Sequence, residues 1–400
     1  MASPIVFDTR FQLPENVKDS FAAQLVRYAP FGTAPLFALT NMVGAKSAIA
    51  TEHGYFTKEM VFPEALVTAA ATAAATSLTV DNVDYMVPGM VFKVFSTGEN
   101  IAVNAINDNG GVLTLTIVRG FGEVPAAPIA ANALIYQIGT AFEEASLRPQ
   151  AINIQPQYIR NFTQIFRNSW GLSNTADAQE TKVGNGERAE NRADCAILHS
   201  LDIEKSIIFG QKHMATRNNQ VIRSMDGLES VIRQYAPNNI ATAGATTNYD
   251  QLEEMLDPVF NIATDPKVAN ERVLFVGAKA NKVLNKIGRL SGQYQIVEGQ
   301  TNFGLQFKTF KISRGQFRII EHPLFNTSVA LSGMAMAVDL TSFDTPYLRK
   351  TSHLGYGLDK EEAPDGGIDA KGGTLTTEVT TEIKNPSANA IIYGLNDAAA

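Results

Sequence analysis

The sequence predicts an α+β protein rather than a doubly wound α/β sheet, and three features predict it. One long amphipathic helix is expected over Glu187–His213, long strand-like segments accompany it, and short strands separated by turns fill residues 64–140. A single long helix beside long strands favours helix-on-sheet packing over alternating βαβ units. The 400 residues exceed what one small core needs, so several domains or a large insertion are expected.

The composition is that of a folded, acidic protein. Hydrophobic residues make up 45% of the chain and charged residues 18%, which is typical of globular rather than disordered sequences. The net charge of −7 does not suit a protein that binds nucleic acid through its phosphates. The single cysteine, Cys195, excludes a disulfide framework within the chain and a multi-thiolate zinc site. Since no signal peptide or membrane span is recognisable, we expect a soluble product of a reducing cytoplasm.

The first part of the chain predicts an arm followed by a long hairpin. Residues 1–45 hold short helical stretches such as Val17–Tyr28, broken by prolines, and cannot form a core alone. Residues 46–63 and 141–172 are expected to be the two arms of one extended hairpin. Between them, residues 64–140 contain five apolar runs separated by turn signals, which predicts an inserted small β-barrel or sandwich. The runs are SLTV, MVFKVFS, NIAVNAI, GVLTLTIV and ALIYQIG.

The middle of the chain predicts a helix about 40 Å long, at 1.5 Å per residue. Its apolar positions recur at helical spacing, with Glu, Arg, Asp and Lys on the opposite face. They are Ala189, Ala193, Ala196, Ile197, Ser200, Leu201, Ile203, Ile207 and Ile208.

A second compact unit is expected after Met225. Its predicted elements are a helix over Tyr249–Ala263, a buried strand at ERVLFVGA, a helix over Lys279–Ile287, a long loop over Gly288–Gly304, a hairpin of Leu305–Ile312 with Phe317–Glu321, a strand over Val329–Leu340, an exposed loop over 355–373, a strand over Thr376–Lys384 and an apolar tail over Ala390–Leu395.

No motif for catalysis, cofactor binding or metal binding is present, so the chain is not expected to be an enzyme. There is no phosphate-binding glycine loop, HExxH or GxSxG pattern, and the histidines are scattered. We expect His199 to be a packing or interface residue and Cys195 a buried, inert thiol. The aromatic residues of Tyr158–Trp170 could form a base-stacking platform, but only Arg160 and Arg167 accompany them. Interface packing is therefore the favoured interpretation.

This order of elements resembles the Hong Kong 97-type major capsid proteins of tailed double-stranded DNA bacteriophages, in a branch with a β-insertion in the extended loop. Three phrases strengthen the resemblance: the V-x-RG-x-G phrase at Val118–Gly122, NFTQIF at Asn161–Phe166 and RSMDGL at Arg223–Leu228. The resemblance implies a peripheral domain over 173–224 and 330–400 with spine helix 187–213, and an axial domain over 225–329.

The resemblance also implies a structural function and its partners. The chain would self-assemble, as hexamers and pentamers, into an icosahedral or prolate head enclosing double-stranded DNA without sequence-specific binding. A portal and a separate scaffolding protein are implied, because the arm before Lys46 leaves no room for a built-in scaffold; a decoration protein is left open. The loop 288–304 is expected near the capsomer's rotational axis. Subunit interfaces are expected at Tyr158, Phe162, Phe166, Trp170, Ser291, Gln293 and Tyr294.

Three other functions stay open at this point. An encapsulin-like compartment would share the fold but hold enzymes, and DNA inside purified particles would exclude it. A tail-tube or fibre protein would form tubes rather than closed shells in electron micrographs. An enzyme with an unrecognised site is the least favoured.

Overall fold

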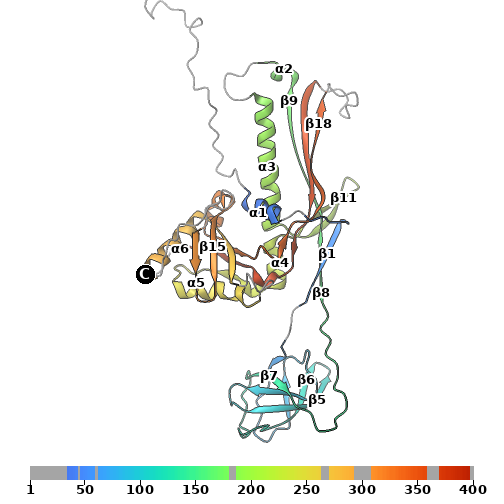
Figure 1. The fold of residues 1–400 in the computed structure, drawn as a ribbon, viewed down its shortest axis with the longest axis vertical. Helices are drawn as coiled ribbons and strands as arrows, with labels where there is room; N and C mark the ends of the chain where they lie inside the picture. Colours follow the sequence, from blue (N-terminus) through green and yellow to red (C-terminus); the bar gives the residue numbers. More distant parts are fainter. Residues whose placement is uncertain are drawn as a thin grey trace, which may run out of the picture. The chain divides into compact units, whose positions relative to one another are not determined.

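The structure, a computed structural model, describes residues 34–43, 46–58, 62–179, 186–262, 270–291, 308–357 and 369–396. It divides into two compact units. One unit consists of residues 1–55 and 159–400 and is called the body. The other unit consists of residues 56–158 and contains a small barrel (Figure 1).

The barrel is a six-stranded antiparallel sheet in the order β2-β7-β4-β5-β6-β3. A bridge between Val67 and Val80, with a hydrogen bond of 2.8 Å from Thr68 N to Thr79 O, joins its first and last strands and closes it. Alternate side chains of each strand fill the interior. The five predicted runs are therefore confirmed as strands. The strands are β2 (Glu64–Leu66), β3 (Ser77–Val80), β4 (Met90–Val94), β5 (Asn100–Asn109), β6 (Val112–Val118) and β7 (Leu134–Thr140).

In the body, a long helix packs against a three-stranded antiparallel sheet. Helix α3 (Glu187–Phe209) contacts β9 (Gln164–Ser173) and β19 (Ala370–Val379), and β18 (Tyr347–Gly357) completes the sheet in the order β18-β19-β9. Figure 1 shows the helix running beside these strands. His199 joins the two layers, with its ring nitrogens 2.7 Å from Asn168 Oδ1 and Thr377 Oγ1. The packing role predicted for His199 is confirmed.

The helix ends earlier than predicted, at Phe209 rather than His213. A Cβ on Gly210 would lie 2.4 Å from the Ser206 carbonyl and 2.6 Å from the Met225 carbonyl, so the backbone of 225–227 can approach only a glycine here. The following residues form a hairpin of β10 (His213–Arg217) and β11 (Gln220–Ser224) that the sequence analysis missed. Its two-residue turn, Asn218–Asn219, has both residues in the left-handed region, at φ 52° and 59°.

The body also contains a six-stranded mixed sheet, in the order β12-β21-β16-β13-β15-β14. Alternate residues of β13 point to opposite faces, and both faces are buried. Val273 and Phe275 join the cluster that contains α3 and α4, whereas Leu274 and Val276 join the one that contains α5 and α6. The elements are α4 (Leu228–Tyr235), β12 (Ile240–Thr242), α5 (Tyr249–Leu256), β13 (Glu271–Val276), α6 (Ala278–Ser291), β14 (Lys308–Lys311), β15 (Gln316–Glu321), β16 (Ala335–Val338) and β21 (Ala390–Tyr393).

Three expectations for the C-terminal half need correction. Strands β16 and β21 pair antiparallel with each other, and β16 pairs with β13, so parts of 330–400 belong to this sheet rather than to a peripheral domain. The supposed tail Ala390–Leu395 is buried because it supplies β21. Val329–Ser332 is a short helix, α7, and the strand begins only at Ala335.

The predicted loop Gly288–Gly304 is helical at its start, because α6 continues to Ser291. Its remainder lies outside the described residues, as do Val17–Tyr28 and most of the predicted loop 355–373. The remaining short elements connect the sheets. They are α1 (Pro35–Val43), β1 (Glu52–Thr57), β8 (Gln157–Phe162), α2 (Asn174–Asp177), β17 (Phe343–Asp344), β20 (Glu382–Ile383), and the 3₁₀ turns at Pro237–Asn239, Asp257–Phe260, Pro323–Thr327 and Pro386–Ala388.

The buried face of α3 generates the first prediction. Ile203 is 1% exposed, in the cluster that joins α3 to both sheets, so Ile203→Asp buries an unpaired charge and should destabilise the subunit by roughly 4 kcal/mol or more. Leu198→Asp on the same helix, at a side chain 56% exposed, is the matched control and should change stability by less than about 1 kcal/mol. Urea unfolding of the unassembled subunit measures both. Equal midpoints for the two variants would contradict the face assignment.

Candidate assembly surface

The chain leaves the body through the two-stranded ribbon of β1 and β8, and polar side chains fix the base of this ribbon. Asn161 is 3% exposed, and its Nδ2 donates to the carbonyls of Asp226 and Thr381, each at 3.1 Å. Its Oδ1 accepts from the Asp226 N–H at 2.7 Å. The Thr163 N–H donates to the Thr51 carbonyl at 2.9 Å. One asparagine thus satisfies backbone groups from two distant segments, which fixes where β8 leaves the body.

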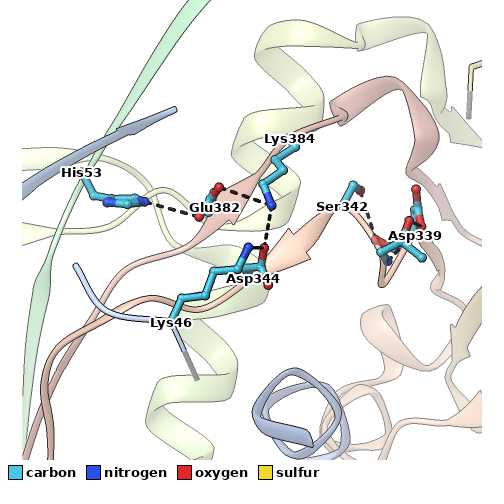
Figure 2. Close-up of polar contacts among 8 residues, drawn as sticks. Lys46, His53, Asp339, Ser342, Asp344, Glu382 and Lys384 are labelled. Carbon is cyan, nitrogen blue, oxygen red and sulfur yellow. Dashed lines mark hydrogen bonds and ion pairs between the residues drawn. The ribbon is translucent and has the colours of Figure 1, made fainter. Parts of the chain in front are cut away.

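A charged group, called here the root cluster, lies where the first arm begins (Figure 2). It consists of Lys46, His53, Asp344, Glu382 and Lys384. The Asp344 carboxylate contacts the Lys46 ammonium and lies 2.9 Å from Lys384 Nζ. Lys384 Nζ is also 3.5 Å from Glu382, whose other oxygen lies 3.4 Å from His53 Nε2. The root cluster therefore joins two residues of the first arm, Lys46 and His53, to β17 and β20.

The pKa of Asp344 reports how strongly the root cluster holds. Burial by itself raises the pKa of this carboxyl, but hydrogen bonds from Lys46 and Lys384 outweigh burial, and the pKa lies below its ordinary value. The pKa of Lys384 is raised: burial opposes that shift, and hydrogen bonding and the carboxylates of Asp344 and Glu382 overcome it. The charges of Asp344 and Lys384 are thus present at neutral pH and paired with each other.

Beyond the root, the chain exposes apolar residues along an extended segment. We call residues 141–158 the arm strip; residues 141–156 have no helix or strand, and every residue of the strip except Ile154 is exposed. Leu147 is 90% exposed, and Phe142 and Ile152 about half. Tyr158 stacks on Phe56, with ring centroids 4.6 Å apart, and both rings remain exposed. A segment with this much apolar exposure and no core of its own is typical of an interface.

The hairpin β10–β11 is a second exposed surface. All residues of β10 are exposed, and so are the first three of β11. Met214 and Val221 are each more than half exposed, and Ile222 is 39% exposed. A two-stranded hairpin is marginally stable by itself, so contacts outside the hairpin are expected to stabilise it.

The V-x-RG-x-G phrase proves to be a structural feature of the barrel. Arg119 Nε and Nη2 each donate at 2.8 Å to the buried Glu99 carboxylate, and the Gly120 N–H donates at 2.8 Å. Burial raises the pKa of Glu99, but these bonds outweigh it and the pKa is lowered. Gly120, with φ 61°, and Gly122, with φ 155°, adopt conformations that favour glycine. The phrase therefore closes the turn after β6.

The predicted interface residues differ in how exposed they are in the single subunit. Tyr158 is exposed and Phe162 is partly exposed, with Lys212 Nζ 5.0 Å from its ring centroid. Phe166 and Trp170 are 7% and 8% exposed within the body, because alternate residues of β9 face α3, so little of either side chain is left for a contact with another subunit. Ser291 ends α6, and Gln293 and Tyr294 lie outside the described residues.

The described residues include no group of three or more His, Cys, Asp or Glu side chains that could hold a metal ion. Within the same residues, no helix is both long and apolar enough to cross a membrane. Cys195 is buried, and burial raises the pKa of its thiol, as expected for an inert cysteine.

The root cluster predicts a pH dependence. Because the pKa of folded Asp344 is depressed, its stabilising contribution is present above the ordinary carboxyl pKa of about 3.9 and is lost as pH falls below it. Asp344→Asn should cost about 1–2 kcal/mol at pH 7, since solvent screens the half-exposed lysines. It should also flatten the fall in stability below pH 4. Asp84→Asn, at an exposed turn, is the control. Parallel pH profiles for parent and Asp344→Asn in thermal unfolding would refute this role.

Comparison with known proteins identifies the family. The family model described as SU10 major capsid protein matches residues 4–396. The chain is 38% identical over 405 residues to the major capsid protein of Pseudomonas phage PaMx41, covering 98% of this chain and 96% of that protein. Among solved structures, one of Mycobacterium phage Bobi covers 98% of this chain and 99% of its own, at 9% identity and a TM-score of 0.48. The holo-SrpI encapsulin complex of Synechococcus elongatus covers 62% and 79%, at 10% identity and a TM-score of 0.41.

The match to the family model covers nearly the whole chain, and the phage relative agrees with it over the same length. The described residues form an α+β fold, as expected from the sequence, and the protein is a structural component of the virion. The chain belongs to the SU10 major capsid protein family and is the shell subunit of a phage head.

Proposed function

We propose that the subunit assembles through the arm strip and the β10–β11 hairpin, each lying against a neighbouring copy of the same chain. The arm strip carries the proposal, because residues 141–158 expose apolar side chains that none of the cores formed by the described residues covers. Burial of this apolar surface against a neighbour would stabilise the contact by about 25 cal/mol for each Å2 removed from water. Many such contacts, each modest, allow misplaced subunits to dissociate during assembly.

Charge supports the second contact. Residues 210–225 carry three Lys and Arg and no Asp or Glu, whereas residues 64–140 carry six Asp and Glu and two Lys and Arg. A basic hairpin and an acidic barrel on different copies attract each other. The contact would be heterologous, because the basic hairpin of one copy meets the acidic barrel of another. Each subunit in the lattice would therefore have a fixed orientation relative to its neighbour.

The proposal extends to the finer partners. The copies form hexamers and pentamers of a closed icosahedral or prolate head around double-stranded DNA, which is enclosed without sequence-specific contacts. The net charge of −7 supports this, because it leaves packaged DNA free to move along the inner wall. A portal and a separate scaffolding protein take part, and the subunit is made in the host bacterial cytoplasm. A decoration protein is compatible with the exposed apolar residues of the barrel.

Removing apolar character from the arm strip tests the proposal. Leu147→Asp should leave the unassembled subunit folded, because the side chain is 90% exposed, but should abolish closed shells in electron micrographs. Leu147→Met, which keeps the apolar surface, should assemble like the parent. Parent particles should contain nuclease-protected DNA when made in infected cells. Normal shells from Leu147→Asp would refute the contact; enzyme cargo instead of DNA, or tubes, would refute the head assignment.

We also propose that residues 64–140 are an independent inserted domain. Glu64 pairs with Tyr136 and Leu66 with Leu134, so the ends of the segment lie side by side. Replacing Leu66–Gln137 by a short Gly-Ser linker should therefore leave the body soluble and helical, with a circular-dichroism signal for α3 retained, while particles become less stable. Loss of the helical signal would show that the body needs the barrel to fold.

A further inference from the structure

We propose that Glu204 is a latch that holds helix α1 (Pro35–Val43) on the body, and that α1 detaches as a unit when this latch is broken. The proposal concerns the single subunit and does not depend on which surfaces assemble. Helix α1 is the first described element of the chain.

The geometry is that of a carboxylate binding the start of a helix. The Leu36 N–H donates to Glu204 Oε1 at 2.9 Å, and the Phe37 N–H donates to Oε2 at 2.7 Å. These N–H groups belong to the first turn of α1, where backbone donors have no partner inside the helix and the helix dipole favours a negative charge. Glu204 is fully buried on the apolar face of α3, at helical spacing from the buried residues Leu201, Ile207 and Ile208.

The third donor to the carboxylate is His322, whose Nε2 lies 2.8 Å from Glu204 Oε1. His322 Nδ1 accepts a hydrogen bond from the Leu324 N–H at 3.2 Å, so this nitrogen carries no proton. In this arrangement Nε2 donates to the carboxylate. Two of the three donors that stabilise the buried carboxylate therefore come from α1. Detachment of α1 removes both at once.

The rest of the body does not depend on α1 in the same way. A nine-residue helix is too short to be stable alone, so α1 unfolds once it leaves. It joins the body's core through Leu36 and Leu39, which pack in the cluster that also holds Ile203 and Ile207. The sheets on either side of α3 keep their own pairing when these two leucines leave. Opening of α1 is therefore a local event.

Thiol labelling measures this opening directly. Leu39 is 9% exposed, so in a Leu39→Cys subunit the introduced thiol reacts with a water-soluble disulfide reagent only when α1 opens. The native Cys195 lies on α3, is 4% exposed and reports global unfolding in the same sample. Adding Glu204→Gln removes the charge and places an amide NH2 against one of the two N–H donors. We expect the introduced thiol to react between about tenfold and a hundredfold faster, with Cys195 unchanged.

Two matched variants separate the latch from general packing. Asp202→Asn makes the same chemical change on the same helix at a half-exposed side chain. Added to Leu39→Cys, it should leave the labelling rate within about threefold of that of the Leu39→Cys subunit alone. His322→Gln keeps the Glu204 carboxylate and both donors of α1, and should keep α1 closed. An unchanged rate in Glu204→Gln would overturn the proposal. So would a parallel rise at Cys195, or failure of that variant to fold, since either would make Glu204 a support of the whole core.

Discussion

The Asp344 carboxylate, held between Lys46 and Lys384, is the interaction on which the start of the first arm depends. Lys46 lies just before the arm, and Lys384 follows β20, so a single side chain fixes the start of the arm to the body. Asn161 performs the same task for the returning strand through hydrogen bonds to Asp226 and Thr381. The apolar side chains of the arm strip are exposed in the single subunit and remain available to a neighbouring copy.

Buried carboxylates bind donors from distant segments at three places. Asp344 binds Lys46 in the root cluster, Glu204 binds the first turn of α1, and Glu99 binds the turn after β6. Desolvation offsets much of the attraction in a buried ion pair, so such pairs add little net stability. Breaking one is costly, however, because a charge remains without partners. These residues therefore fix geometry, while stability comes from the apolar clusters on both faces of the β13 sheet and inside the barrel.

Local sequence pattern predicted the parts of the fold that local interactions determine. The barrel strands and α3 follow from alternation and helical spacing, whereas the hairpin around the Asn218–Asn219 turn, which lies beyond the end of α3's predicted range, was missed. Pairing between distant segments was not predictable: the apolar run Ala390–Leu395 gives no sign that it lies beside β16. The same holds for the site. Tyr158 is exposed, but Phe166 and Trp170 have the same aromatic character and face inward. Helical spacing puts Glu204 on the apolar face of α3, but its partners, α1 and His322, come from distant parts of the sequence.

The central claim is that the arm strip is completed only by another copy of the chain. Amide hydrogen exchange, compared between unassembled subunits and intact particles, tests it most directly. The account predicts that peptides covering residues 141–158 exchange freely in the subunit and at least about tenfold more slowly in the particle, while peptides of α3 around Ile203 are protected in both. Equal exchange of the arm strip in the two states would contradict the account.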